Sequence, residues 1–296
     1  MTAVSRRYDC SDPEERAAGI ADAVSSVRRG ELVVLPTDTV YGIGADAFLP
    51  SAVQALLDAK GRGRQMPAPV LVGTVRAASA LVEDLGTYGQ DLVDEFWPGA
   101  LTVVCRANTN LSWDLGETKG TVAVRMPLHE LAIELLKETG PMAVSSANLT
   151  GRPPARTVAE AEEQLGDAVA VYLDGGEAGD ALPSSIVDLT GSVPRLLRAG
   201  AIPEKTLRDV LGVLLVETDE EVEDKDEDKD EAEDKKDDKD QDPREDEREA
   251  KHDDEDRNED RNEAVGGATA AEAAETDTND AATSAAKRDT KDAPAE

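Results

Sequence analysis

The sequence has few of the residues that mark secreted, membrane and metal-binding proteins. Its 296 residues include two cysteines and two histidines, and only 3% are aromatic. Two cysteines cannot build a disulfide framework or a zinc cluster, and two histidines exclude a histidine-rich metal site. No segment approaches the roughly 18 uninterrupted apolar residues of a membrane-spanning helix, and residues 1–12 lack the apolar stretch of a signal peptide. We therefore expect a cytoplasmic protein.

Acidic residues outnumber basic residues two to one, and the excess lies mostly at the C-terminal end. The chain has 64 Asp and Glu against 32 Lys and Arg, a formal net charge of −32. Residues 1–216 carry −10 of this charge, and residues 217–296 carry −22. The second segment has no Phe, Trp, Tyr, Leu, Ile or Met, so it cannot bury enough apolar surface to offset the entropy of ordering. The sequence predicts one folded domain over 1–216 and a disordered acidic tail over 217–296.

Apolar runs and helix-capping residues divide the folded part into helices and strands. Pro13 after Asp12 is typical of a helix start, Gly30 of a helix end, and the sequence from Thr157 to Glu160 matches a capping box. Helices are expected to begin near residues 13, 50, 128, 157 and 203, with two more within 75–96, and strands are expected over 32–35, 70–72, 101–104, 121–125, 142–144, 169–172, 185–188 and 195–197. Because the two types do not alternate strictly, we expect an α/β or α+β single domain around a twisted mixed sheet.

Polar and cationic residues follow several of these elements. Hydroxyls and glycines fill the segment 36–44 after the first strand, and Lys60, Arg62 and Arg64 alternate with glycines after a helix. Such a group of cations suits a polyphosphate, although an exposed basic turn explains it equally well. No P-loop motif is present. Gly42-x-Gly44 lacks the third glycine of a dinucleotide fingerprint, and a tight turn explains it equally well.

Two further polar groups follow predicted strands. Arg125 ends the strand at 121–125, where it could form a surface ion pair or bind a carboxylate through two parallel hydrogen bonds. The segment 145–148, Ser-Ser-Ala-Asn, could be a binding loop or a simple polar turn. His129 is the only histidine in the predicted folded part, so nucleophilic catalysis by serine is not expected.

Taken together, these segments resemble the YrdC/TsaC family of L-threonylcarbamoyladenylate synthases. The resemblance covers about residues 13–212, and the combination K-x-R…S-x-N is the family's signature. It is carried by six segments in order: Pro36-Thr37-Asp38-Thr39-Val40-Tyr41-Gly42-Ile43-Gly44-Ala45, Lys60-x-Arg62, Trp97-Pro98-Gly99, Val124-Arg125-Met126-Pro127, Ser146-x-Asn148 and Leu197-Arg198.

The resemblance implies a reaction and a fold. L-threonine, bicarbonate and ATP would give threonylcarbamoyl-AMP, pyrophosphate and water, and a partner transferase would pass the threonylcarbamoyl group to tRNA. The fold implied is a single YrdC-like domain, in which the sheet surrounds a positively lined cavity. Mg²⁺ is expected as a counter-ion of the phosphates, without a protein ligand that the sequence identifies.

The resemblance also implies roles for individual residues. The predicted threonine site consists of Thr37, Arg125, Val144 and Ser184. The predicted ATP site consists of Lys60, Arg62, Arg64, Thr121, Ser146, Asn148, Pro154 and Arg198, with Lys60 and Arg62 as the residues on which catalysis depends. The chain departs from the family pattern at Gly73, where many members have a histidine beside the threonine.

Other functions remain open from the sequence alone. A cationic cavity could bind double-stranded RNA or tRNA without turnover, although the net charge of −10 argues against broad affinity for nucleic acid. A carbamoyl-transfer domain of hydrogenase maturation proteins is similar in sequence but normally lies within a much longer chain. The tail is expected to be a solubilising extension, with competition for the cavity or shielding from RNA as the alternative.

Overall fold

The structure is a computed structural model that describes residues 5–179, 182–212 and 215–217. All of these residues fall in one compact unit, Met1–Lys229. Apart from Glu217, the predicted acidic tail lies outside the described residues. No helix among the residues described is long and apolar enough to cross a membrane.

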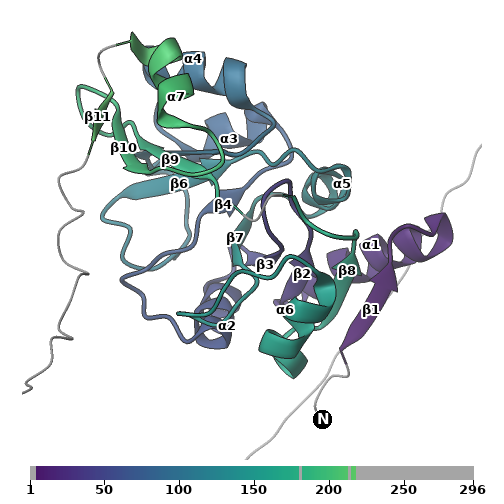
Figure 1. Cartoon of the computed structure of the whole chain (residues 1–296). Coiled ribbons are helices and arrows are strands. Elements are labelled where there is room, and N and C mark those ends of the chain that lie inside the picture. The colour runs from purple at the N-terminus through teal and green to yellow at the C-terminus, as the bar shows by residue number, and fades with distance from the viewer. Residues whose placement is uncertain (1–4, 180–181, 213–214, 218–296) are drawn as a thin grey trace, which may run out of the picture. The chain divides into compact units, whose positions relative to one another are not determined.

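The described strands form one sheet of eleven strands, in the order β1-β8-β2-β3-β7-β4-β6-β5-β9-β10-β11. The sheet is mixed: β8 and β2 run parallel and β2 and β3 antiparallel, and from β7 onward the pairs alternate, with β7 and β4 antiparallel, β4 and β6 parallel, and β6 and β5 antiparallel. The predicted mixed sheet is thus confirmed (Figure 1). The strands are β1 (Arg6–Asp9), β2 (Val33–Leu35), β3 (Gly42–Asp46), β4 (Val70–Leu71), β5 (Leu101–Arg106), β6 (Thr121–Arg125), β7 (Met142–Ser146), β8 (Val171–Asp174), β9 (Ser185–Asp188), β10 (Arg195–Arg198) and β11 (Val216–Glu217).

Helices cover both faces of the sheet and bury an apolar core on each. One core cluster lies beneath α1 and α5, and a larger one lies beneath the helices on the other face. Figure 1 shows α3, α4 and α7 gathered near β9 and β10, with α1 near β1 and β8. The helices are α1 (Pro13–Arg28), α2 (Pro50–Lys60), α3 (Val75–Leu81), α4 (Gly86–Phe96), α5 (Glu130–Thr139), α6 (Val158–Leu165), the 3₁₀ turn η1 (Gly166–Ala168) and α7 (Glu204–Leu211).

Capping side chains explain why α1 and α6 begin where the sequence predicts. The Asp12 side chain accepts hydrogen bonds from the amides of Glu14 and Glu15, both at 2.9 Å, at the start of α1. Thr157 accepts one from the amide of Glu160 at 3.2 Å. The Glu160 carboxylate bonds the amide of Arg156 rather than that of Thr157, so the capping box is only half formed.

The segment 36–44, expected as a loop, ends in a strand. Gly42 and Gly44 lie in β3, which pairs antiparallel with β2 and β7. A Cβ atom at Gly42 would lie 2.6 Å from Cγ1 of Val144, and one at Gly44 would lie 2.7 Å from Cε of Met142. The two glycines therefore let β3 pack under side chains of β7, and they form neither a tight turn nor a dinucleotide site.

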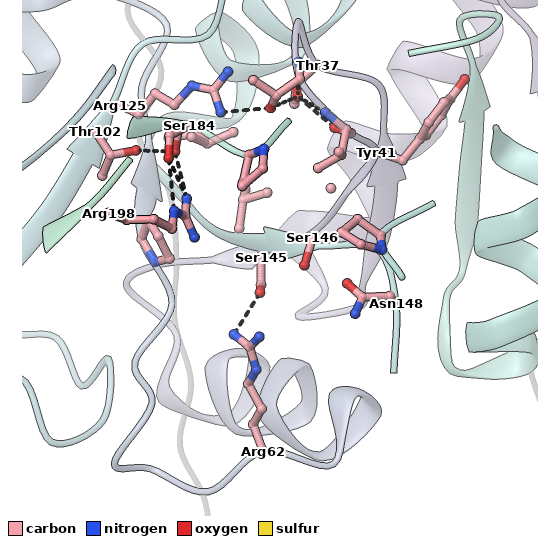
Figure 2. Close-up of a pocket in the computed structure, with 18 residues that line it drawn as sticks. Thr37, Tyr41, Arg62, Thr102, Arg125, Ser145, Ser146, Asn148, Ser184 and Arg198 are labelled. Carbon is pink, nitrogen blue, oxygen red and sulfur yellow. Dashed lines mark hydrogen bonds between the residues drawn. The ribbon is translucent and has the colours of Figure 1, made fainter. Parts of the chain in front are cut away.

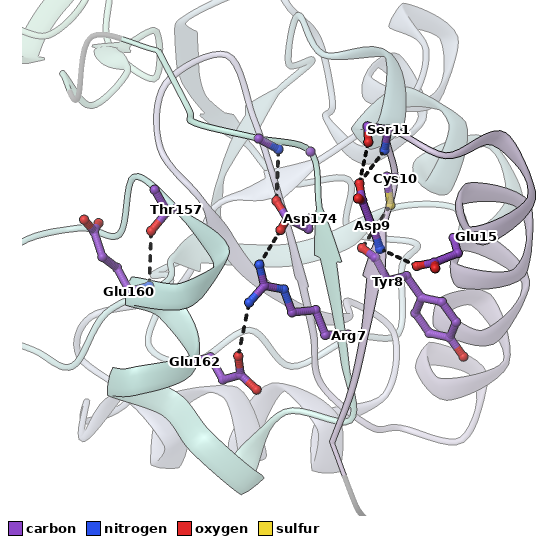
Figure 3. Close-up of polar contacts among 12 residues, drawn as sticks. Arg7, Tyr8, Asp9, Cys10, Ser11, Glu15, Thr157, Glu160, Glu162 and Asp174 are labelled. Carbon is purple, nitrogen blue, oxygen red and sulfur yellow. Dashed lines mark hydrogen bonds and ion pairs between the residues drawn. The ribbon is translucent and has the colours of Figure 1, made fainter.

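Strand β1 was not predicted, because it is short and mostly exposed. Its pairing with β8 is supported by ion pairs: the Arg7 guanidinium lies 2.5 Å from the Asp174 carboxylate and 3.8 Å from that of Glu162 (Figure 3). Asp174 also accepts a hydrogen bond from the amide of Gly176 at 3.0 Å. The contacts thus tie the N-terminal edge of the sheet to the loop after β8.

Candidate active site

A polar cavity of about 340 Å³ opens where loops and strand ends from both halves of the sheet meet. Figure 2 shows side chains reaching it from the segment before β3, the end of β7, the segment after α2, β5, β6 and β10. Nine of the twelve predicted site residues line it: Thr37, Arg62, Arg125, Val144, Ser146, Asn148, Pro154, Ser184 and Arg198. The structure thus brings together segments that are up to about 160 residues apart.

Three arginines dominate the electrostatics of the cavity. Burial lowers the pKa of Arg62, of Arg125 and of Arg198, and for Arg198 the charges of the other two add to the effect. Holding three guanidinium groups together costs desolvation and mutual repulsion. Asp38 offsets the charge of Arg125, and an anionic ligand would offset the charges of Arg62 and Arg198, so the cavity suits an anion.

Arg125 lies at the end of β6, almost fully buried, and is held from three sides. Its Nε donates to the carbonyl of Gly99 at 2.9 Å, one Nη to the Thr39 hydroxyl at 3.0 Å, and the other to Asp38 at 2.7 Å. A guanidinium has five N–H groups, so two remain for a ligand. Thr37 joins the same network, because its hydroxyl lies 3.1 Å from that of Thr39.

Arg62 reaches the cavity from the chain just after α2. One of its terminal nitrogens donates to the Ser145 hydroxyl at 3.0 Å. Its Nε is buried and has no hydrogen-bond partner among the described residues. A buried donor without a partner is costly, and an oxygen of a ligand in the cavity would satisfy it.

Arg198 lies at the end of β10 and is the third arginine that lines the cavity. It donates twice to the carbonyl of Ser184, at 3.0 and 2.8 Å, and once to the Ser184 hydroxyl at 3.1 Å. That hydroxyl also lies 2.8 Å from the hydroxyl of Thr102 in β5. Ser184, predicted for threonine, and Arg198, predicted for ATP, are therefore direct neighbours.

Lys60 does not line the cavity. It is the last residue of α2, its exposed fraction is 1%, and its ammonium group donates to the carbonyl oxygens of Ser146 and Asn148 and to Oδ1 of Asn148. Burial, and secondarily the charge of Arg62, lower its pKa to about 7. Its contact with the cavity is indirect, through the S-x-N segment.

Two other predicted ATP residues and Gly73 lie away from the cavity lining. Arg64 is exposed and bonds Asp114 at 2.5 Å, and the Thr121 hydroxyl donates to the carbonyl of Thr118 at 2.8 Å. A Cβ at Gly73 would lie 3.1 Å from backbone atoms of Leu136 and Lys137. Gly73 thus packs closely against the end of α5.

Several lining residues were not predicted. They comprise polar side chains that the strands supply and apolar residues that surround them: Thr39, Val40, Tyr41, Gly42, Pro69, Leu71, Thr102, Ser145 and Pro183. Tyr41 is held in the lining by its hydroxyl, which donates to the carbonyl of Gly176 at 2.6 Å. Thr39 and Tyr41 lie within a segment that the sequence did single out, whereas nothing in the sequence marks Thr102, which lies inside an apolar strand.

Comparison with known proteins identifies the family of the chain. A family model described as "Sua5_yciO_yrdC: Telomere recombination" matches residues 25–200. A Mycobacterium tuberculosis protein named "Putative threonylcarbamoyl-AMP synthase" is 54% identical over 210 residues, 71% of this chain and 97% of the relative. The threonylcarbamoyl-AMP synthase of Bacillus subtilis is 34% identical over 217 residues, 72% of this chain and 61% of the relative.

A solved structure gives the same result for the fold. The crystal structure of Pyrococcus abyssi Sua5 complexed with L-threonine matches with a TM-score of 0.65 and 31% sequence identity, over 72% of this chain and 62% of that one. A family match over more than half of the chain, a highly similar relative of nearly full coverage and a shared fold all agree. The chain belongs to the Sua5/YciO/YrdC family, as the resemblance to YrdC/TsaC proteins predicted.

Proposed function

We propose that this protein is a threonylcarbamoyl-AMP synthase. Its relatives in Mycobacterium tuberculosis and Bacillus subtilis carry that name, and the Pyrococcus abyssi structure holds L-threonine. In the reaction, the amine of threonine combines with bicarbonate to give a carbamate and water. A carbamate oxygen then attacks the α-phosphorus of ATP, the bond to the β,γ-phosphates breaks, and pyrophosphate leaves.

The convergence of Arg62, Arg125 and Arg198 on one cavity carries the proposal. The reactants are a carboxylate, a carbamate and a triphosphate, which repel one another in water. Fixed cations and hydrogen-bond donors in a partly dry site bring such groups together and stabilise the charge that develops in the transition state. Catalysis would then depend on positioning and electrostatics, because none of the described residues that line the cavity is placed as an evident general base.

The geometry supports a division of the cavity between the substrates. Arg125, with Thr37, Val144 and Ser184, would hold threonine, with the free N–H groups of Arg125 on its carboxylate. ATP would be held by Arg62 and Arg198 together with the other predicted ATP residues that line the cavity, Ser146, Asn148 and Pro154. The roles predicted for Lys60, Arg64 and Thr121 stay predictions, since these side chains lie outside the cavity lining.

Several accompanying components belong to the same proposal. Mg²⁺ would arrive with the triphosphate, since the described residues contain no group of three His, Cys, Asp or Glu side chains that could hold it. The product would pass to a transferase that modifies tRNA in the cytoplasm. The catalytic domain would span residues 1–216, in line with a Mycobacterium tuberculosis relative that is almost fully covered by a 210-residue match.

A substrate-omission assay tests the function. Purified protein is incubated with ATP, Mg²⁺, threonine and bicarbonate, pyrophosphate is measured, and mass spectrometry identifies the nucleotide product. We expect pyrophosphate release that requires both threonine and bicarbonate, and that is reduced in Arg62→Ala. Tight binding of double-stranded RNA without turnover would favour the binding-module alternative and contradict the proposal.

A further inference from the structure

The C-terminal end of α2 holds the S-x-N segment through both its backbone and its side chain. The carbonyl oxygen of Lys60 accepts hydrogen bonds from the amide and the hydroxyl of Thr150, at 3.1 and 2.8 Å. The Lys60 ammonium group donates to the carbonyls of Ser146 and Asn148 and to the Asn148 side chain. One residue thus fastens both ends of the turn that follows β7.

Donors and acceptors at this position match in number. A protonated lysine has three N–H donors and no acceptor, and three oxygens of the turn face it. With all three donors used and an exposed fraction of 1%, the ammonium group has no free N–H to offer a phosphate. Ser146 and Asn148, by contrast, both line the cavity.

We propose that Lys60 is a positioning residue for the ATP site: its ammonium group keeps the Ser146–Asn148 turn in the shape that binds the nucleotide and does not itself touch the phosphates. This inference rests on the proposed function for the identity of the nucleotide. It reassigns the K of K-x-R from the reacting groups to the turn beside them, and leaves Arg62 as the member of that pair that faces the ligand.

The surroundings of Lys60 also determine its protonation. No carboxylate among the described residues pairs with Lys60, and burial, with a smaller contribution from the charge of Arg62, lowers the pKa of Lys60 to about 7. A neutral amine keeps two donors and turns a lone pair toward an acceptor, so deprotonation loosens the turn. A bound triphosphate favours the charged form. ATP binding therefore takes up a proton above pH 7, and ATP affinity falls as the pH rises.

The first test uses the ligand-free protein, so its result does not depend on which reaction the protein catalyses. Backbone amide NMR signals of Ala147 and Asn148 are followed from pH 5.5 to 9.5 in the wild type and in Lys60→Met. We expect them to shift with a midpoint near pH 7 in the wild type and to lose that transition in the variant. Both histidines remain in the variant, so their titration cancels in the comparison.

If the variant does not fold, ¹³Cε-lysine labelling of the wild-type protein gives the second measurement. One lysine signal that titrates near pH 7, with a nuclear Overhauser contact to Ala147, supports the proposal. Unchanged amide shifts across the pH range, an identical transition in Lys60→Met, or a lysine signal that moves only on adding ATP would overturn it.

The pH dependence of the KM for ATP distinguishes this positioning role from a purely structural one. In the wild type the KM for ATP is expected to rise with pH above about 7, whereas in Lys60→Met it is raised about tenfold and is flat with pH. The KM for threonine changes much less. Lys205→Met, which removes an exposed lysine paired with Asp209 on α7, is the matched control and keeps the wild-type profile. A pH profile of Lys60→Met that parallels the wild type contradicts the proposal.

Discussion

Asp38 and Arg125 are joined across 87 residues of sequence by a hydrogen-bonded ion pair of 2.7 Å, and both side chains are largely buried. The same oxygen of Asp38 accepts the amide of Leu128 at 2.9 Å. Arg125 is therefore oriented before any ligand arrives, because its position is fixed by a carboxylate that is itself fixed by the backbone. Such preorganisation lowers the entropy that substrate binding must offset.

This arrangement predicts a selective effect of Arg125→Lys. A lysine presents a single ammonium group, so it cannot bond Gly99, Thr39 and Asp38 and also offer two parallel donors to a carboxylate. We expect the KM for threonine to rise more than tenfold and the KM for ATP less than threefold, measured by steady-state pyrophosphate release. Asp38→Asn, which keeps the shape but removes the charge, should show the same selectivity at smaller size. Equal losses for both substrates would refute the assignment of Arg125 to threonine.

Substitution of Arg62 should lower activity much more than substitution of Arg64, although only one residue separates them. Arg62 faces the cavity with an unpartnered Nε, whereas Arg64 makes an exposed ion pair with Asp114. Arg62→Ala is expected to lower kcat/KM more than tenfold, about 1.4 kcal/mol or more of transition-state stabilisation. Arg64→Ala is expected to change it less than about twofold, since exposed ion pairs contribute little. A large loss in Arg64→Ala would show that this arginine moves to the phosphates when ATP binds.

The sequence predicted the element types well because they depend on local patterns. Helix α2 begins at Pro50 and ends at Lys60 as expected, and the strand at 121–125 ends at Arg125. It missed β3, where two glycines lower strand propensity and the reason for them lies in β7, about 100 residues away. It missed β1 because a short edge strand with exposed charges carries no alternating pattern.

The sequence predicts which residue types form the site, but it does not predict well which way their side chains point. A lysine two residues before an arginine indicates cations near a ligand, but the sequence does not show that Lys60 turns toward the carbonyls of Ser146 and Asn148 while Arg62 faces the cavity. Thr102 joins the site because β5 pairs in parallel with β9 and so brings it beside Ser184. That pairing is a long-range contact, which a pattern within one strand does not encode.

The close packing of β3 against β7 predicts the effect of Gly42→Ala. The new methyl group would lie 2.6 Å from Cγ1 of Val144, so Val144 or the strand must move, at a cost of about 1–3 kcal/mol in the free energy of unfolding. Chemical denaturation measures this loss, and a raised KM for threonine should accompany it because Val144 lines the cavity. Gly191→Ala is the matched control, since its methyl group would meet only the carbonyl of Val193 at 3.6 Å. Equal stability of the two variants would contradict the packing argument.

The buried charge of Lys60 predicts how stability depends on pH. In the unfolded chain the pKa of a lysine is about 10.4, whereas in the folded protein that of Lys60 is about 7. Between these values the unfolded state binds more protons, so the free energy of unfolding rises with pH, by up to about 1.4 kcal/mol per pH unit from this group. Below pH 7 both states are protonated and the full cost of burying the charge remains.

Denaturation of the wild type and of Lys60→Met between pH 7.5 and 9.5 isolates this contribution, because every other titrating group is common to both proteins. We expect a more positive slope in the wild type, while its affinity for ATP falls over the same range. Stability and nucleotide binding then change in opposite directions with pH, because loss of one proton removes a buried charge and also a donor that the turn needs. Parallel slopes in the two proteins would mean that Lys60 keeps an ordinary pKa in the folded state.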